Sequence, residues 1–236
     1  MPTQHTLPLP TFPGDVQPEY LEGWLTLNQE QEMADSSSKA GPWSTESDRA
    51  AIIDCLEKLE KEEQQQQGAF RLRLSTADDL QHIERLVHGL ALYEKEPESV
   101  HVTAEHYRHD GFTKDQPPLF HCILLEDTTG VKPYVCGMAF CFFGYTFGEG
   151  RFLYLEDLFI EKEYRGKGGG ALAMNTLSKV ARSLQCARMI WQVLDWNTPA
   201  LNLYDKLGGK VQDGLLTSRF AGDEHLQKFY QGRTSY

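Results

Sequence analysis

The sequence of 236 residues lacks any apolar run long enough to cross a lipid bilayer. A membrane-spanning helix needs about 18–20 consecutive apolar residues. Arginine is absent before Arg49, and the first residues contain no basic stretch followed by an apolar one. These features argue against an arginine-rich organelle transit peptide and against a secretory signal. We therefore expect a cytoplasmic protein with no membrane partner.

Cysteine is sparse, and no two cysteines form a C-x-x-C pair. The five cysteines are Cys55, Cys122, Cys136, Cys141 and Cys186. An odd number at irregular spacing fits reduced thiols better than a disulfide framework or a zinc site. His101, His106 and His109 lie close in sequence, but no cysteine or carboxylate pattern completes a metal site around them. We expect buried thiols and no bound metal.

Positive charge is also scarce, since the net charge is −11. Residues 1–68 contain 13 acidic and 4 basic side chains, so most of the negative charge lies in this part of the chain. A nucleic-acid-binding protein needs a clustered basic surface, which this composition does not offer. Nucleic acid is therefore excluded as an expected partner, whereas a cationic substrate is electrostatically favoured.

The N-terminal part of the chain reads as an extension of a folded domain. Residues 1–45 are acidic and rich in proline and serine, which predicts an extended or disordered segment. Over residues 46–68, apolar side chains recur at helical spacing at Ile52, Ile53, Leu56 and Leu59, before the chain reaches Gly68. This pattern predicts a peripheral helix without a chemical role, whose apolar stripe packs either on the domain or on a partner.

Regular patterning begins at Ala69 and predicts one domain over residues 69–236. Phe70, Leu72 and Leu74 alternate with arginines, which is the period of a half-buried strand. Further strands are predicted at 119–125, 134–145, 152–160 and 188–194, with helices at 75–92, 103–111, 168–184 and 198–207. One or two final strands are expected after Lys210. This order indicates an α/β fold with a mixed central sheet flanked by helices.

The most informative segment is a strand that runs into a glycine-rich loop and then directly into a helix. Glycines let successive backbone N–H groups converge, and a helix N-terminus adds its positive dipole, so that together they suit a pyrophosphate. Such loops alone are weak indicators, because many are simply turns. A P-loop needs Lys after its second glycine, whereas Ala171 follows Gly170. The spacing of a dinucleotide-binding fingerprint also fails, which disfavours both nucleotide classes.

Arg165, Gly168 and Gly170 form the pattern Arg-x-x-Gly-x-Gly, which resembles the coenzyme A loop of the GNAT superfamily of N-acetyltransferases. Across residues 69–220 the chain is similar to the diamine (spermidine/spermine) and thialysine acetyltransferases. The segments that carry this similarity are Ala91-Leu-Tyr-Glu94, Asp110-Gly-Phe112, Phe120-His-Cys122, Tyr154-Leu-Glu-Asp157, Tyr164-Arg-Gly166, Leu194-Asp-Trp-Asn197 and Leu203-Tyr204. The resemblance implies a GNAT-like fold with an N-terminal extension, and acetyl-CoA as co-substrate.

The resemblance also implies direct transfer of an acetyl group to a small amine, with two catalytic residues. An alkylamine has a pKa near ~10, so a carboxylate must accept its proton and a donor must protonate the departing thiolate. By resemblance, Glu156 is the acceptor and Tyr204 is the donor. Glu156 also lies on a strand that otherwise reads as buried, where an unpaired carboxylate is unfavourable. An ion pair for Glu156 and core packing for Tyr204 are the structural alternatives.

The same resemblance assigns the residues that contact the coenzyme and the amine. Pantetheine would pair with the strand backbone, the loop would hold the pyrophosphate, and an asparagine would contact the coenzyme and cap the following helix. The coenzyme residues are Leu158, Phe159, Ile160, Arg165, Gly166, Lys167, Gly168, Gly169, Gly170, Ala171 and Asn197. The amine residues are Tyr93, Glu94, Glu156 and Asp157.

Two segments depart from the pattern of the spermidine/spermine enzymes. Tyr145–Gly150 lacks the expected Asp-Pro-Trp, and Asp213–Ser218 stands where Glu-Glu-Gly-Trp is expected. Losing these acidic and aromatic residues makes a shorter amine, or the side-chain amine of a lysine analogue, at least as favoured as a long polyamine. Acetylation of a protein lysine or N-terminus, and a non-catalytic acyl-CoA-binding interaction protein, remain alternatives. Since the diamine enzymes are homodimers, the resemblance also implies a homodimer.

Overall fold

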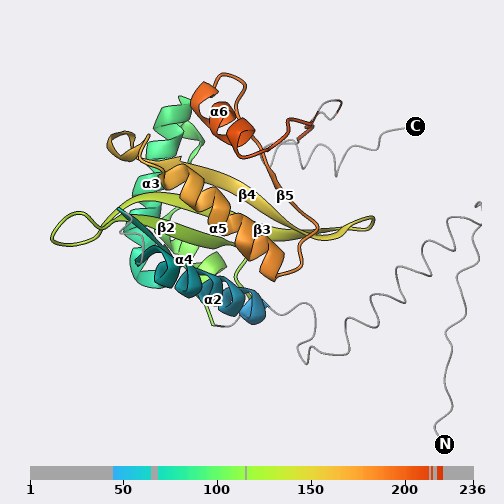
Figure 1. The fold of residues 1–236 in the computed structure, drawn as a ribbon, viewed down its shortest axis with the longest axis horizontal. Helices are drawn as coiled ribbons and strands as arrows, with labels where there is room; N and C mark the ends of the chain where they lie inside the picture. Colours follow the sequence, from blue (N-terminus) through green and yellow to red (C-terminus); the bar gives the residue numbers. More distant parts are fainter. Residues whose placement is uncertain (1–44, 65–68, 115, 213, 215–216, 220–236) are drawn as a thin grey trace, which may run out of the picture. The chain divides into compact units, whose positions relative to one another are not determined.

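The computed structural model describes residues 45–64, 69–114, 116–212, 214 and 217–219 (Figure 1). Two units divide the chain, residues 1–48 and 49–236, and the second contains the sheet. The segment predicted to be disordered, residues 1–45, lies outside the described residues except for Thr45, where a helix begins. No helix in the described ranges is long and apolar enough to cross a membrane.

Five strands form one mixed sheet in the order β1-β2-β3-β4-β5, which confirms the predicted fold class. Neighbouring strands are antiparallel from β1 to β4, whereas β4 and β5 are parallel. The strands are β1 (Phe70–Leu74), β2 (His121–Asp127), β3 (Tyr134–Thr146), β4 (Gly150–Ile160) and β5 (Arg188–Trp191). Each lies within two or three residues of a predicted boundary; β1 shows period-two alternation, whereas β2 is a continuous buried run.

Helices cover both faces of this sheet, with α2 and α5 on one face and α3 and α4 on the other (Figure 1). The α-helices are α2 (Thr45–Gln64), α3 (Leu80–Glu94), α4 (Ala104–Phe112), α5 (Gly169–Ser183) and α6 (Thr198–Lys206). Short 3-10 helices are η1 (Ala77–Asp79), η2 (Pro97–Ser99) and η3 (Lys162–Tyr164). Thr103 caps α4 through a capping box, as its position in the sequence predicts.

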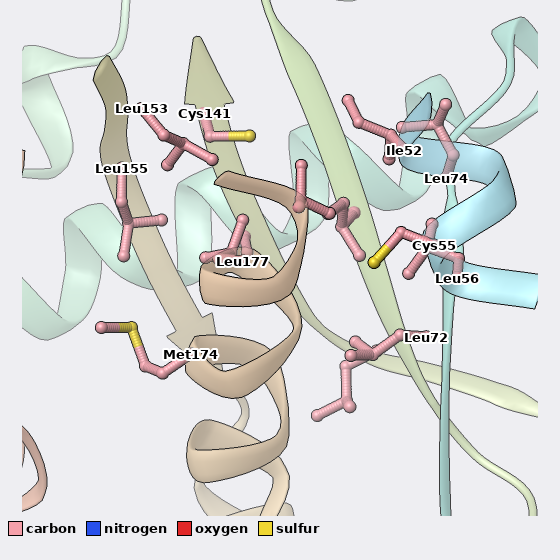
Figure 2. Close-up of a cluster of buried hydrophobic side chains, with 14 of the residues drawn as sticks. Ile52, Cys55, Leu56, Leu72, Leu74, Cys141, Leu153, Leu155, Met174 and Leu177 are labelled. Atoms are coloured by element: carbon pink, nitrogen blue, oxygen red, sulfur yellow. The ribbon is translucent and has the colours of Figure 1, made fainter. Parts of the chain in front are cut away.

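The core between α2, α5 and the sheet shows where the apolar stripe of the N-terminal helix packs. Ile52, Cys55 and Leu56 of α2 join a buried cluster that includes Leu177 of α5, and Figure 2 shows these side chains converging over the strands. Ile52 and Leu177 are both fully buried. Ile52 and Leu56 of the predicted stripe therefore pack on the domain, whereas Ile53 is exposed, so its assignment to the stripe is wrong. The side chain of Leu59, also predicted to belong to the stripe, lies outside the described residues.

A second core lies between the sheet and the helices α3 and α4. It contains Ile83 and Leu86 of α3, together with Leu124, Met138 and Phe159 from three successive strands. A Cβ on Gly89 would lie 3.0 Å from the ring of Phe159, so the absent side chain lets α3 approach β4 closely. The C-terminal end of α3 is thereby held beside the end of β4.

Two irregularities in β4 and β5 shape the sheet near the loop that follows β4. Phe140 pairs with Asp157 and Cys141 with Leu155, so Glu156 is an additional residue that forms a β-bulge. The strand β5 ends at Trp191, three residues earlier than predicted, and its last pair is with Leu155. Residues 156–160 of β4 consequently extend beyond the β4–β5 ladder.

The remaining sequence predictions concern the cysteines and the tail. Four cysteines are buried, Cys186 is partly exposed, and all five are free thiols, which confirms the reduced pattern. Of the final strands expected after Lys210, none forms in the described part of the tail, residues 210–212, 214 and 217–219. The rest of that prediction lies outside the described residues.

Candidate active site

The separation of β4 from β5 leaves one edge of β4 accessible. Residues 157–160 pair with β3 on one side, while the β4–β5 ladder stops at the Leu155–Trp191 pair. Leu158, Phe159 and Ile160, the strand residues predicted to contact the coenzyme, all lie on this segment. Their side chains pack into the two cores, so their backbone groups face the separation. An extended ligand that binds at this edge could form hydrogen bonds with these backbone N–H and C=O groups.

The glycine-rich loop after β4 forms the start of α5. Gly166 and Gly168 have φ angles of 74° and 93°, values that a side chain strongly disfavours, and open space lies where their Cβ atoms would be. The N–H of Leu172 donates to the carbonyl of Gly168 (3.0 Å), so the N–H groups of Gly169, Gly170 and Ala171 precede the first helical bond. None of the described side chains caps this end. The geometry fits a bound anion.

Gly169 and Gly170 serve a different purpose from the two preceding loop glycines. A Cβ on Gly169 would lie 2.7 Å from Cδ2 of Leu125, and one on Gly170 would lie 3.0 Å from Cδ2 of Leu203. Both positions therefore require a missing side chain because α5 begins in close contact with the sheet and with α6. The N-terminal end of α5 is thereby packed against two elements.

Tyr204 lies on α6, beside the point where the strands separate. Its ring centroid is 5.1 Å from that of Trp191, the residue that ends β5 opposite Leu155. Glu156 directly follows Leu155, the residue of β4 that pairs with Trp191, so the two residues predicted to be catalytic are linked through the end of β5. Burial raises the pKa of Tyr204 above the ordinary value for tyrosine, so its hydroxyl, which is protonated at neutral pH in any case, can act as a donor.

Tyr93, Asn197 and Arg165 connect three elements at the rim of the site. The hydroxyl of Tyr93 on α3 donates to Oδ1 of Asn197 (2.9 Å), which also accepts from the N–H of Ala200 (3.4 Å) and caps α6. The guanidinium of Arg165 lies 4.4 Å from the Tyr93 ring centroid, and its Nε donates to the carbonyl of Ile160 (2.6 Å). A cavity of about 600 Å³ opens beside them, between α3 and η3.

The acidic residues of the site differ from the sequence prediction. Glu156 was expected to be enclosed on a buried strand, but its side chain is exposed, because the bulge turns it out of the alternation. Asp157 is the more enclosed carboxylate: burial, followed by the negative charges of Glu156 and Glu94, raises its pKa to about 7. Burial, followed by the charge of Glu96, also raises the pKa of Glu94. The sequence prediction of an enclosed Glu156 is therefore wrong.

These acids contrast with the paired acids elsewhere in the domain. Asp79 and Glu126 both form ion pairs with Arg73, and these bonds anchor β1 to its neighbours. Within the described ranges, no lysine or arginine forms an ion pair with Glu94, Glu156 or Asp157. The negative charges of Glu156 and Glu94 thus act on Asp157 with no ion-pair partner among the described residues, an arrangement that a cationic ligand would stabilise.

Lys167, which was predicted to contact the coenzyme, lies within the glycine-rich loop, where its ammonium is 5.3 Å from the ring centroid of Tyr164. Conversely, sequence reasoning missed Trp191 and Trp196 as site residues; the only signal was that Trp196 lies inside the Leu194–Asn197 motif. No group of three or more histidine, cysteine or acidic side chains in the described ranges is placed to hold a metal ion.

Solved structures of known proteins share this fold. An integron cassette protein from the mobile metagenome of V. cholerae, VCH_CASS6, has a TM-score of 0.56 at 19% identity, covering 70% of this chain and 99% of that chain. An aminoglycoside acetyltransferase from a soil metagenome has a TM-score of 0.54 at 12% identity, covering 66% and 97%. At these identities the likeness shows the fold alone.

Sequence comparison then gives the family. A model of the acetyltransferase (GNAT) family matches residues 83–209, more than half of the chain. The thialysine N-epsilon-acetyltransferase of Bos taurus is 34% identical over 159 residues, covering 64% of this chain and 92% of the relative. The human spermidine/spermine N(1)-acetyltransferase-like protein 1 is 32% identical over 168 residues, covering 69% of this chain and 24% of that protein. The chain belongs to the GNAT family and is an N-acetyltransferase.

Proposed function

We propose that this enzyme transfers an acetyl group directly from acetyl-CoA to a small cationic amine, either a short diamine or a thialysine-like amino acid. The observation that carries the proposal is the group of three unpaired carboxylates, Glu94, Glu156 and Asp157, beside the separation of β4 and β5. A cation is the ligand that relieves the repulsion acting on Asp157. The names of the relatives, thialysine and spermidine/spermine acetyltransferases, support the same chemical class.

Acetyl-CoA supplies the acetyl group as a thioester, and the residues present fit its two ends. The N–H groups at the start of α5 and the open space at Gly166 and Gly168 suit the pyrophosphate. The accessible backbone of residues 158–160 suits an extended arm with amide groups. Arg165 adds a positive charge to the rim between these two regions. No metal has a role in this proposal.

The amine must lose a proton before it can act as a nucleophile. Glu156 and Asp157 are neighbours in sequence and interact electrostatically, so we propose that the pair accepts this proton, Glu156 from its exposed position on the bulge. A pKa of about 7 for Asp157 suits an acceptor that works near neutral pH. Tyr204, protonated at neutral pH, then donates to the departing thiolate.

Thiol release from acetyl-CoA tests the proposal across putrescine, spermidine, spermine, thialysine, lysine and a lysine peptide. We expect turnover with a short diamine or with thialysine, and weaker turnover with spermine, because the acidic group is compact. Turnover only with the peptide would instead indicate a protein acetyltransferase. No turnover with any amine, while acetyl-CoA still binds, would contradict the proposed function.

A further inference from the structure

The helix α6, which carries Tyr204, lies on the surface of the domain. It has only nine residues, Thr198–Lys206, and none of them is fully buried. A helix of this length is not stable by itself in water, so its position depends on its contacts with the rest of the domain. Because Tyr204 is the proposed proton donor, a residue that fixes α6 also fixes the donor.

The start of α6 is held by a hydrogen bond from another helix. The hydroxyl of Tyr93 on α3 donates to Oδ1 of Asn197 (2.9 Å), and the same oxygen accepts from the N–H of Ala200 (3.4 Å) as the N-cap of α6. Tyr93 and Asn197 are 104 positions apart in the sequence. Within the described ranges, no other side-chain hydrogen bond joins α6 or its cap to a different element. This bond therefore anchors the start of α6 to α3.

The ring of Tyr93 is itself held in place, which restricts the direction of its hydroxyl. The guanidinium of Arg165 lies 4.4 Å from the ring centroid, and Nε of Arg165 donates to the carbonyl of Ile160 (2.6 Å). The ring of Trp196, the residue before Asn197, lies 5.6 Å away, centroid to centroid. Tyr93 thus contacts both the loop after β4 and the segment before α6.

Further along α6, the contacts are apolar. A Cβ on Gly170 would be 3.0 Å from Cδ2 of Leu203, so Leu203 lies against the start of α5, and the Tyr204 ring centroid is 5.1 Å from that of Trp191. Apolar contacts keep the helix against the domain but are not directional, whereas a hydrogen bond is directional. The direction of the Tyr204 hydroxyl therefore depends on the bond at the N-terminal cap of α6.

We propose that Tyr93 is a positioning residue for the proton donor: through Asn197 it holds α6 in the orientation that directs the Tyr204 hydroxyl toward the departing thiolate. This inference rests on the proposed function. By resemblance, Tyr93 was expected to contact the amine, whereas in the structure its hydroxyl donates to Asn197. Loss of this bond should slow the transfer step and leave amine binding unchanged.

Steady-state kinetics with acetyl-CoA and either putrescine or thialysine separates the two roles. We expect Tyr93→Phe, which keeps the ring and removes the hydroxyl, to lower kcat by about three- to tenfold, the rate equivalent of one neutral hydrogen bond, at an unchanged KM for the amine. Tyr134→Phe on β3, whose hydroxyl contacts Glu161 (3.4 Å), should have wild-type kinetics. A raised KM at unchanged kcat in Tyr93→Phe would show that Tyr93 binds the amine, and would overturn the inference.

Further variants show whether the effect passes through the cap and the donor. Asn197→Ser keeps a good N-cap, but its side chain is too short to reach Tyr93, so it should lower kcat as much as Tyr93→Phe does. In the double variant Tyr93→Phe/Asn197→Ser the two losses should not add, because either change removes the same bond. Tyr93→Phe should also cost little in a Tyr204→Phe background, since no hydroxyl remains to be directed. Additive losses in either double variant would overturn the inference.

Hydrogen exchange of α6 tests the same link without turnover. In Tyr93→Phe and Asn197→Ser, the N–H groups of residues 201–204 should exchange about three- to tenfold faster, whereas those of α5 should match the wild type, as should α6 in Tyr134→Phe. If α6 exchanges faster while no amine is acetylated, the positioning of α6 stands and the proposed function fails. If amines are acetylated and Tyr93→Phe has the wild-type kcat, the proposed function stands and the inference fails, whether or not α6 exchange changes.

Discussion

At the residue scale, Asp157 carries a consequence for stability. Its pKa of about 7 in the folded state lies above the ordinary 3.8. Between these two pH values, the carboxyl is protonated in the folded protein and ionised in the unfolded chain. The stability that protonated Asp157 contributes to the folded state is therefore lost as the pH rises through about 7. We expect Asp157→Asn to stabilise the protein at pH 8 by roughly 1–3 kcal/mol, since one pKa unit corresponds to ~1.4 kcal/mol. The expected gain is smaller than the full shift because the side chain of Asp157 is only partly buried.

Denaturant unfolding at two pH values checks this expectation. The gain from Asp157→Asn should shrink as the pH is lowered from 8 to 5, because the wild-type carboxyl then becomes neutral in the folded state. Asp78→Asn, which changes an exposed carboxyl in η1, two residues before α3 begins, should have the same small effect at both pH values. An equal gain from Asp157→Asn at pH 5 and pH 8 would contradict the assignment.

Glu94 should control the pH dependence of catalysis through Asp157. The negative charge of Glu94 raises the pKa of Asp157, so Glu94→Gln should lower that pKa. Because the ionised carboxylate accepts the proton, kcat/KM should rise with pH through about 7 in the wild type, and this rise should occur at lower pH in the variant. A profile of kcat/KM against pH measures the shift; an unmoved profile would show that Asp157 does not govern it.

Tyr204 provides the test of the proton donor. Tyr204→Phe keeps the ring that packs on Trp191 and removes only the hydroxyl, so acetyl-CoA should bind with unchanged affinity. Turnover should fall by about 10²–10⁴-fold, the usual contribution of a positioned acid or base. Tyr145→Phe, on the hairpin between β3 and β4, is the matched control. Wild-type turnover of Tyr204→Phe would remove Tyr204 from the mechanism.

At the element scale, the junction of β4 and α5 depends on the backbone conformation of Gly168. Gly168→Ala would force a side chain into a φ of 93°, so we expect weaker binding of coenzyme A by about tenfold and a loss of roughly 1–2 kcal/mol of stability. Gly148→Ala, on the β3–β4 hairpin with open space around its Cβ, should change neither quantity. Equal affinity in the two variants would refute an anion site at this loop.

The helix α2 offers a second test at this scale, because adjacent isoleucines have opposite environments. Ile52 is fully buried in the core with α5, whereas Ile53 is 39% exposed. Ile52→Ala should destabilise the domain by about 2–4 kcal/mol, and Ile53→Ala by less than about 1 kcal/mol. Denaturant midpoints measure both. Similar small losses would mean that α2 is not part of the domain's core.

Most helices and strands could be predicted from the sequence. The features that could not be predicted depend on local details of the backbone. Alternation of apolar residues predicts β1, and short apolar runs predict the strands that follow. The glycines at 166 and 168 predict a loop that suits an anion. The bulge at Glu156 could not be predicted, because one inserted residue is indistinguishable from continued alternation in a single sequence. That insertion exchanges the environments of Glu156 and Asp157, so the enclosed acid was assigned to the wrong position.

At the scale of the whole molecule, residues from distant parts of the sequence meet at the end of the sheet. Tyr93 and Glu94 come from α3, Asp157 from β4, and Asn197 and Tyr204 from α6. The sequence motifs contain most of these residues. Their contacts, such as the hydrogen bond between Tyr93 and Asn197, depend on the tertiary fold. Coenzyme binding, the homodimer and the identity of the amine stay predictions.

A competition experiment tests the central claim most directly. The wild-type enzyme is supplied with acetyl-CoA and equal concentrations of putrescine, thialysine, spermine, butylamine and a lysine peptide, and mass spectrometry follows each acetylated product. Initial product ratios give the ratios of kcat/KM. We predict that acetyl groups appear first on putrescine or thialysine, the small amines with a second positive group. Acetylation mainly of the peptide, or of butylamine as fast as putrescine, would contradict the account.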